Sequence, residues 1–441
     1  MQNRAFNYSL RSDCYPTVIQ DGGTVKAEQI RALAEDAAKR LAHFRGGRIA
    51  LATRRVGSIV AAIQASQAVG CDLLLLREAP APDSPAWRAW QVTGLLDDNL
   101  IARPLDNASP DIGDACLLLP TSGTTGTPKI VRHHLGLLLM PLSGYAPPER
   151  RRTLIGYHPV SFAGLKVMLA ATVAGGQLVA ESEPTLSRLA QTAMRFAPDE
   201  FRGTPTIMRS LLALLGAEAC KLPFARVGLA GETIDQPLLD RLRALLPHAE
   251  LWQNYGASET GSFMTVKDGR AGFPARWLDE GLGPVRMRIV DGVFEVASPI
   301  AMLGYLGGPM RHPGDPPTWW RTGDMMGIEG DRAYFLGRAD SLINVGGAKV
   351  RPEEVEQLLL SVAGVMDARV FGRPNPITGQ LVAADVAAMP GIDHTALRRR
   401  IQDLLAVHLE RHKLPQFLQI TSQLAIDPSG KKPRRKHDNA G

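Results

Sequence analysis

The chain has 441 residues, 45% of them hydrophobic and 21% charged, which is typical of a globular enzyme and too long for one ordinary core. Five of the positive charges behind its formal charge of +6 lie in the tail KKPRRKH (431–437), so the charge gives no reason to expect a nucleic-acid partner for the rest of the protein. Its four cysteines form no CxxC pair, which argues against a disulfide framework or a cysteine metal site.

The first elements alternate between strand and helix. Residues 46–55 predict a short strand, and the apolar segment 58–76 predicts a buried helix running into a second strand. This segment is interrupted by Gln64 and Gln67, which disfavours a membrane span. The N-terminus carries no apolar signal core, so we expect a cytoplasmic protein without membrane insertion.

The stretch LLLPTSGTTGTPKIVRHH (117–134) combines an apolar run with glycines, hydroxyls and one lysine. Its composition is equally compatible with a surface loop and with a phosphate-binding loop, in which glycines let backbone N–H groups approach an anion. It is not the common P-loop, because Gly126 is followed by Thr127-Pro128-Lys129 rather than by Lys-Ser/Thr.

Helical and strand patterns continue to alternate through the middle of the chain. We expect a helix closed by Gly175-Gly176 and then a strand within 163–180, a helix over 205–215 and a strand over 225–231. Such alternation predicts an α/β fold with layered, mainly parallel sheets. Two further clusters, WQNYGASETGS (252–262) and WWRTGDMMG (319–327), offer polar side chains after apolar residues, but each one alone is typical of an ordinary turn.

The pattern changes toward the C-terminus. Asp291-Gly292 predicts a hairpin turn within a small β-rich part, and helices are expected over 353–361 and 395–409. We place a boundary at Gly337–Asp340. The expected organisation is therefore a large N-terminal α/β domain (1–337), shortened at its start, and a small mobile α+β C-terminal domain (338–441).

Five motifs in this order resemble the adenylate-forming superfamily of acyl-CoA synthetases, stand-alone adenylation domains and beetle luciferases. In chain order, the motifs are TSGTTGTPK (121–129), NYGASE (254–259), RTGD (321–324), GRADSLINVGGAKVRPEEVE (337–356) and PSGKKPRR (428–435). The resemblance covers about residues 46 to 436. It implies activation of a carboxylic acid by ATP as an acyl-adenylate, with release of pyrophosphate, followed by thioester formation.

The resemblance also implies roles for individual residues. A phosphate loop would comprise Thr121, Ser122, Gly123, Thr124, Thr125, Gly126 and Lys129. Gly231, Glu232, Asn254, Tyr255 and Gly256 would line the adenine site, and Asp324 and Arg338 would bind ribose. Glu259 would bind Mg²⁺, and Ser258 would contact the α-phosphate. Lys431 would be the catalytic lysine of the adenylation step, whereas its neighbour Lys432 is expected to be solvated and its removal mild.

Further roles concern the thioester step. Asp340 matches the hinge about which the C-terminal domain rotates, and Gly346 and Gly347 would let a pantetheine arm approach. The thiol acceptor would be CoA or the phosphopantetheine of an acyl or aryl carrier protein. Three hypotheses stay open: an acyl- or aryl-CoA ligase, a stand-alone enzyme that loads a carrier protein, and an ATP-binding protein without ligase activity.

The substrate pocket is expected near YHPVSFAGLKV (157–167). The segment from Ser161 to Gly164 lacks the Asp that pairs with an α-ammonium group in amino-acid-activating relatives. Phe162 and Met168 suggest an apolar wall, which favours an aryl or short alkyl acid over an amino acid; the alternative is that both are ordinary core residues. Ser161 and Gly256 are expected to line the pocket together with Phe162. His158 is expected to be structural rather than a substrate contact.

Overall fold

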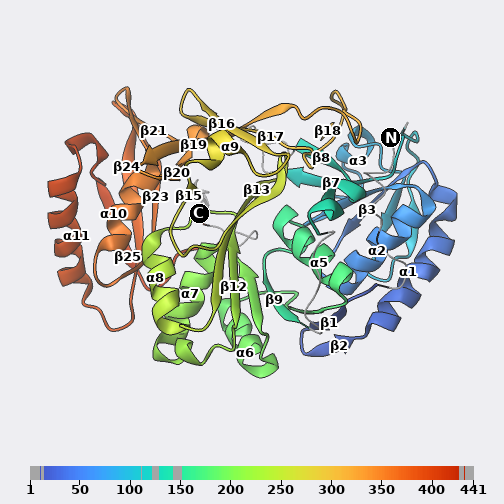
Figure 1. Cartoon of the computed structure of the whole chain (residues 1–441), viewed down its shortest axis with the longest axis horizontal. Helices are drawn as coiled ribbons and strands as arrows, with labels where there is room; N and C mark the ends of the chain where they lie inside the picture. Colours follow the sequence, from blue (N-terminus) through green and yellow to red (C-terminus); the bar gives the residue numbers. More distant parts are fainter. Residues whose placement is uncertain are drawn as a thin grey trace.

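The computed structural model describes Leu10 and Lys432 and residues 14–110, 112–121, 129–142 and 151–426. The N-terminal part of the chain forms two large mixed sheets that Figure 1 shows at the right and in the centre. The first sheet has its strands in the order β18 (Gly304–Tyr305), β8 (Lys129–His134), β7 (Cys116–Thr121), β4 (Asp72–Leu76), β3 (Arg48–Ala52), β5 (Gly94–Leu96) and β6 (Ala102–Pro104).

The second large sheet is parallel from β13 to β1, with antiparallel strands at its edges. Its order is β14 (Gly261–Val266), β13 (Glu250–Ala257), β12 (Arg226–Ala230), β11 (Glu200–Gly203), β9 (Arg152–Gly156), β10 (Gln177–Ala180), β1 (Thr17–Gln20) and β2 (Gly23–Val25). The mainly parallel sheets expected from the alternation of elements are therefore confirmed.

The main core lies between these two sheets. Alternate residues of both sheets pack there against apolar residues of α1 (Ala27–Leu41), α2 (Val56–Val69) and α5 (Phe162–Ala174). The outer face of the second sheet is covered by α6 (Leu186–Phe196), α7 (Pro205–Leu215) and α8 (Gln236–Leu245). Strands buried on both faces explain why runs such as residues 73–76 are apolar throughout.

Two smaller sheets complete the described structure. The antiparallel one has the order β15 (Phe273–Pro274), β20 (Arg332–Arg338), β19 (Trp319–Glu329), β17 (Val293–Ala297) and β16 (Arg286–Val290). The predicted hairpin is confirmed, because Asp291 and Gly292 join β16 to β17 with φ angles of 50° and 72°. The C-terminal sheet has the order β22 (Ala348–Val350), β21 (Ile343–Val345), β24 (Gly379–Ala388) and β23 (Val365–Asn375), and β25 (Phe417–Thr421) also pairs with β24.

The remaining helices are short or belong to the C-terminal part, which Figure 1 shows at the left. α10 (Pro352–Ser361) and α11 (His394–His408) pack on the C-terminal sheet, where both were expected. The proposed domain boundary falls at the end of β20 and in the short helix η4 (Ala339–Ser341). The short helices are α3 (Ala86–Ala89), α4 (Leu135–Leu139), α9 (Trp277–Glu280), η1 (Ala42–Phe44), η2 (Met140–Leu142), η3 (Gly216–Lys221), η4 (Ala339–Ser341) and η5 (Arg411–Lys413). None of the described helices is both long and apolar enough to span a membrane.

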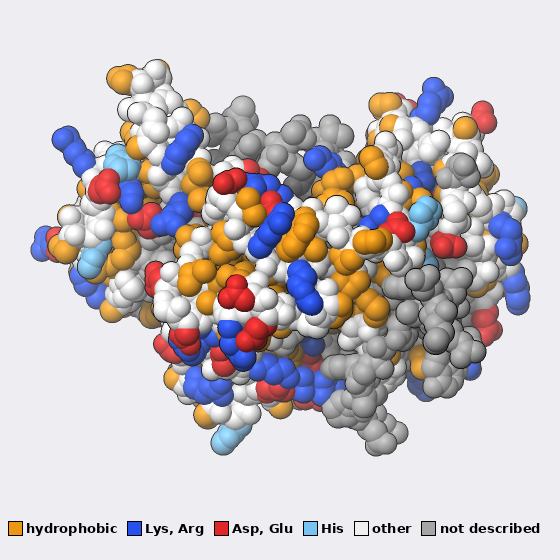
Figure 2. Space-filling view, turned by 45° about the horizontal axis from the view of Figure 1, so that its top comes forward, with side chains coloured by type: hydrophobic (Ala, Val, Ile, Leu, Met, Phe, Trp, Pro, Cys, Tyr) orange, Lys and Arg blue, Asp and Glu red, His pale blue; other side chains and the backbone are white. Residues whose placement is uncertain are grey.

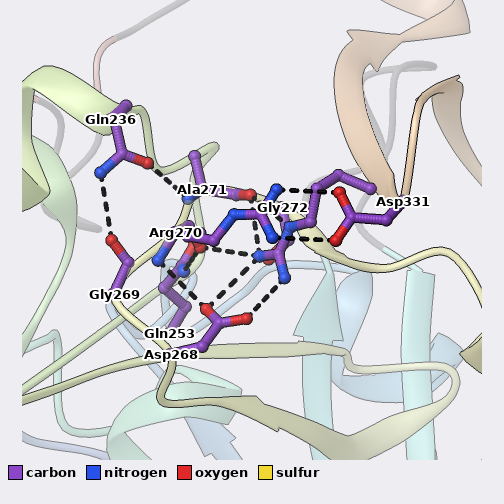
Figure 3. A network of polar contacts seen from close by, with 9 residues as sticks. Gln236, Gln253, Asp268, Gly269, Arg270, Ala271, Gly272 and Asp331 are labelled. Atoms are coloured by element: carbon purple, nitrogen blue, oxygen red, sulfur yellow. Dashed lines mark hydrogen bonds and ion pairs between the residues drawn. The ribbon is translucent and has the colours of Figure 1, made fainter.

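A buried arginine joins the second large sheet to the antiparallel sheet. Arg332 on β20 is 1% exposed, and its guanidinium donates to Asp268 and to the carbonyls of residues 270–272 (Figure 3). The same loop is held by Gln253 of β13, whose amide donates to the Arg270 carbonyl at 2.6 Å, and by Gln236 of α8. These bonds fix β13 relative to β20, the two strands that carry Tyr255 and Arg338.

Charges are mixed over the face of the molecule shown in Figure 2. Lys and Arg side chains lie between Asp and Glu side chains, with hydrophobic residues across the middle of this face. Oppositely charged side chains also pair at exposed positions of the described chain, as in Lys267–Glu250 and Arg270–Asp331. Interleaved signs of this kind are typical of an ordinary solvated surface.

Candidate functional site

A cavity of about 2650 Å³ lies where the large sheets, the antiparallel sheet and the C-terminal part meet. Its lining includes residues at or just past the ends of β7, β12 and β13, together with one face of α5. Polar side chains collect at such sites because the carboxyl ends of parallel strands open into loops. Most of the predicted site residues that the structure describes border this cavity.

One side of the cavity brings Lys129, Tyr305 and Glu259 together. The Lys129 ammonium lies 5.2 Å from the centre of the Tyr305 ring, and the Tyr305 hydroxyl donates to Glu259 Oε1 at 3.1 Å. Burial, and next the negative charge of Glu259, raise the pKa of Tyr305. Thr121 Oγ1 donates to the Lys129 carbonyl at 3.3 Å, so the two strands that flank the predicted phosphate loop end at this side. Residues 122–128, with Ser122, Gly123, Thr124, Thr125 and Gly126, lie outside the described residues.

A second side of the cavity carries Tyr255, Asp324 and Arg338. The Tyr255 hydroxyl donates to Asp324 Oδ2 at 2.5 Å, and Arg338 Nη1 lies 3.4 Å from Asp324 Oδ1. The Tyr255 ring stacks on Phe335, with the ring centres 4.5 Å apart. Burial, followed by the charge of Asp324, raises the pKa of Tyr255, which keeps the hydroxyl protonated and able to donate. A carboxylate held in this way can accept hydrogen bonds from two neighbouring hydroxyl groups of a ligand.

Asn254 and Glu232 border the same region. Asn254 Oδ1 is buried without a hydrogen-bond partner among the described residues, although the residue lines the cavity. A buried polar atom of this kind fits an exocyclic amine of a ligand. Glu232, in contrast, already accepts from the backbone N–H and the hydroxyl of Thr206, both at 3.0 Å. Gly231, just before it, has a φ angle of 88°.

One residue of the NYGASE motif, Gly256, has a clear local reason for its identity. A Cβ atom on Gly256 would lie 2.6 Å from the Ser262 Cα, so the close approach of β14 requires glycine there. Ser258 follows β13 at the edge of the cavity. Both residues therefore lie next to Glu259 at the carboxyl end of β13.

Helix α5 supplies an apolar wall. Its first turn is capped by Ser161, whose hydroxyl accepts from Gly164 N at 3.1 Å and donates to the His158 carbonyl at 2.7 Å. Phe162 lines the cavity and stacks on His133, with ring centres 5.2 Å apart. Met168 is fully buried in the main core and is not among the residues lining the cavity, so only Phe162 of the expected apolar pair faces it. His158 accepts from Val160 N at 3.3 Å, and burial lowers its pKa to about 3, in keeping with a structural histidine.

We expect Ser161→Ala to destabilise the protein by about 1 kcal/mol, because the first turn of α5 loses its cap. Ser161→Thr keeps the hydroxyl and should stay close to the parent. The measurement is urea unfolding monitored by tryptophan fluorescence, in which the transition midpoints of both variants are compared. Equal midpoints for the alanine and threonine variants would contradict the capping role.

The predicted hinge lies next to the Tyr255 side of the cavity. Arg338 Nε donates to Asp340 Oδ1 at 3.0 Å while its Nη1 faces Asp324, so one guanidinium joins the hinge residue to the cavity. Burial alone would lower the pKa of Arg338, but the carboxylates of Asp340 and Asp324 outweigh it and hold it above its usual value. Gly346 and Gly347 form the β21–β22 turn with φ angles of 59° and 94°, which favour glycine.

The expectation that Lys432 is solvated is wrong. Its side chain is 12% exposed, and its ammonium donates to Asp367 Oδ1 at 3.1 Å and to the Ala368 carbonyl at 2.6 Å. Its backbone N–H donates to Glu232 Oε1 at 3.3 Å, and the residue lines the cavity. Burial would lower the pKa of Lys432, but Asp367, Glu356 and Glu232 together raise it. Lys431, the predicted catalytic lysine, lies outside the described residues.

The described residues fit a magnesium ion that is held mainly by a substrate. No group of three or more histidine, cysteine or acidic side chains that could hold a metal ion is found in the described part of the chain. Mg²⁺ bound with nucleotide phosphates, however, needs only one or two carboxylates from the protein. Glu259, at the edge of the cavity beside Lys129 and Tyr305, is a carboxylate in a suitable place.

Two residues of the cavity were not assigned a role from the sequence. Tyr305 lies on β18, and only its contact with Glu259 and Lys129 reveals its place. Lys166 lines the cavity one helical turn after Phe162. A lysine within the otherwise apolar helix FAGLKVMLAATVA was a signal that could have identified it.

Sequence comparison finds the AMP-binding enzyme family over residues 23–306 and its C-terminal domain, described as AMP-binding enzyme C-terminal domain, over residues 354–431. Human mitochondrial acyl-coenzyme A synthetase ACSM1 is 26% identical over 359 residues, which cover 73% of this chain and 61% of that protein. The 3-hydroxybenzoate–CoA ligase of Aromatoleum sp. (strain CIB) is 27% identical over 366 residues, covering 76% of this chain and 68% of the ligase.

Structure comparison finds the same fold in a solved enzyme. The anthranilate CoA ligase AuaEII, in complex with anthranoyl-AMP, superposes with a TM-score of 0.76 at 19% sequence identity. The match covers 97% of this chain and 94% of that one. The expected α/β class, with layered sheets and a smaller C-terminal part, is confirmed by this likeness.

Proposed function

Because the chain belongs to the AMP-binding enzyme family, we propose that it is an AMP-forming acid–thiol ligase, which activates a carboxylic acid with ATP and transfers the acyl group to a thiol. The observation that carries this proposal is one cavity bordered by three sets of groups. These are Lys129 with Glu259, Tyr255 with Asp324 and Arg338, and the apolar face of α5. They suit triphosphate, ribose and acyl group respectively.

The reaction brings together two anions, a carboxylate and ATP, and their repulsion must be offset by positive charge and oriented donors. In the proposed arrangement Lys129 and the residues from Thr121 to Gly126 hold the β- and γ-phosphates. Arg338 and Asp324 hold the ribose. Lys431 stabilises the charge that develops between the carboxylate and the α-phosphate. Ser258 also contacts the α-phosphate.

Glu259 would hold Mg²⁺, whose positive charge would offset that of the phosphates. The Tyr305 hydroxyl donates to Glu259 Oε1 and so orients that carboxylate. This hydrogen bond does not involve Glu259 Oε2. Tyr255 orients Asp324 in the same manner through its hydroxyl. Asn254 is placed to accept from the adenine amine through its buried Oδ1.

An aryl or short alkyl acid suits the proposed pocket, because α5 presents Phe162 and small apolar residues to the cavity. The relatives named for 3-hydroxybenzoate and anthranilate support an aromatic acid. CoA is the proposed acceptor. A carrier-protein phosphopantetheine is the alternative, since it presents the same thiol arm to Gly346 and Gly347.

The deciding experiment is acid-dependent exchange of labelled pyrophosphate into ATP, over a panel of aryl, short alkyl, fatty and amino acids. Exchange with a narrow set of acids supports adenylation and names the substrate class. Addition of CoA or of a holo carrier protein then separates the two acceptors by thioester formation. Binding of ATP without exchange for any acid would favour an ATP-binding protein without ligase activity.

Asp324→Ala should weaken ATP binding about 10-fold, because the ribose hydroxyls lose their acceptor. The exposed Asp279 on α9 offers a matched control, Asp279→Ala, which should leave affinity unchanged. Isothermal titration with ATP in the absence of acid measures the effect. Equal affinity for both variants would contradict the ribose role of Asp324.

A further inference from the structure

Lys166 is a lysine on an otherwise apolar helix that lines the cavity. It lies about one turn after Phe162, about 6 Å further along α5, and Ala163, Val167 and Ala170 on the same face also line the cavity. We call these residues the α5 face (Phe162, Ala163, Lys166, Val167 and Ala170). Apart from Lys166, this face offers a ligand no charged group.

The Lys166 ammonium has no counter-ion among the described residues. Its hydrogen bond there goes to the Leu138 carbonyl of α4, at 2.5 Å. No described carboxylate forms an ion pair with it, and burial is the sole influence on its pKa. An ammonium group has three donors, so this bond leaves two of them for a ligand. Burial lowers the pKa of Lys166 to about 8, which reflects the cost of a charge that is removed from water without a partner.

The neighbouring titratable groups do not supply that partner. His133 of β8 is 1% exposed, and its pKa is lowered to about 3, first by burial and then by the positive charges of Lys166 and Arg311. The histidine is therefore neutral and adds no negative charge to this region. It stacks on Phe162, with the ring centres 5.2 Å apart.

We infer that the α5 face takes an acid with a second anionic group, a dicarboxylic acid on an aryl or short alkyl frame, and that Lys166 pairs with the group remote from the reacting carboxylate. This inference rests on the proposed function. The apolar residues of the α5 face hold the carbon frame of the acid. The single ammonium group of this face, that of Lys166, determines which end of the acid points away from ATP. Lys166 is thus a specificity-determining residue rather than part of the phosphate-binding machinery.

The test is pyrophosphate exchange with sets of acids that share a frame and differ in one group. Pentanoate, glutarate and γ-aminobutyrate carry a methyl, a carboxylate and an ammonium at the same end, and meta-toluate and isophthalate form an aromatic pair. The parent should prefer a dicarboxylate over its methyl counterpart at least 10-fold in kcat/KM. Lys166→Met should lower exchange with dicarboxylates about 30-fold and leave exchange with the methyl acids nearly unchanged.

Two further variants separate a charge effect from a folding defect. Lys166→Arg keeps the charge and should keep the preference, whereas Lys166→Glu should move the preference from glutarate toward γ-aminobutyrate. Lys39→Met, at an exposed lysine on α1, is the matched control and should behave as the parent. Circular dichroism and thermal unfolding of each variant show that it is folded.

The possible outcomes are distinct. Preference of the parent for methyl acids, or an equal loss with both kinds of acid in Lys166→Met, would overturn the inference and leave the proposed ligase function intact. The second of these results would place Lys166 at the reacting carboxylate. Exchange with no acid in the panel would overturn the proposed function and, with it, this inference.

Discussion

Lys431→Ala should reduce acid-dependent pyrophosphate exchange about 1000-fold while ATP affinity changes little. The reason is that the proposed role of this lysine is confined to the transition state, where charge develops between carboxylate and α-phosphate. Removing one such preorganised donor typically costs two to three orders of magnitude in rate, on the order of 3–4 kcal/mol. The proposed contacts for ground-state binding of ATP are made instead by Lys129, Asp324 and Arg338, which the substitution leaves in place.

The second half-reaction provides the internal control for this prediction. If the C-terminal part rotates about Asp340 after adenylation, Lys431 leaves the site before the thiol attacks. Acyl transfer from a supplied acyl-adenylate to CoA should then proceed in Lys431→Ala at close to the parent rate. Loss of ATP binding in this variant, or an equal loss in both half-reactions, would show that the role is misassigned.

The regular elements could be predicted from local patterns. Gly175 and Gly176 after α5, Pro352 at the start of α10 and Asp291-Gly292 between β16 and β17 each act within a few residues of their own position. Their consequences follow from backbone conformation alone, so the elements were found where expected.

The contacts that build the site could not be predicted in this way, because they join residues far apart in the chain. The amide of Lys432 and the carboxylate of Glu232 are 200 positions apart, and Tyr255 and Asp324 are 69 apart. Motif order placed Tyr255 and Asp324 in one site, because both belong to motifs of a recognised family. Nothing in the motif around Lys432 shows that its ammonium is buried against Asp367.

Lys432 connects two parts of the chain at the cavity. Its ammonium is held by β23 through Asp367 and the Ala368 carbonyl, with Glu356 of α10 at 4.0 Å. Its amide is held by Glu232, which also binds the first turn of α7 through Thr206. Lys432 therefore contacts both the C-terminal sheet and the N-terminal part, and it is directly next in sequence to the proposed catalytic lysine.

Lys432→Met should consequently lower the rate of pyrophosphate exchange about 100-fold, contrary to the mild effect expected from the sequence. Removing the Lys432 ammonium takes a positive charge away from the buried carboxylates of Asp367 and Glu356, at a cost of roughly 3 kcal/mol, and disfavours the conformation in which Lys432 is held at the cavity. Acyl transfer from a supplied adenylate should change little, because it uses the rotated conformation. The double variant Lys432→Met with Asp367→Asn should recover part of the loss, since it also removes one unpaired charge. Unchanged exchange in Lys432→Met would mean that the conformation with Lys432 held at the cavity is not the one in which the acid is adenylated.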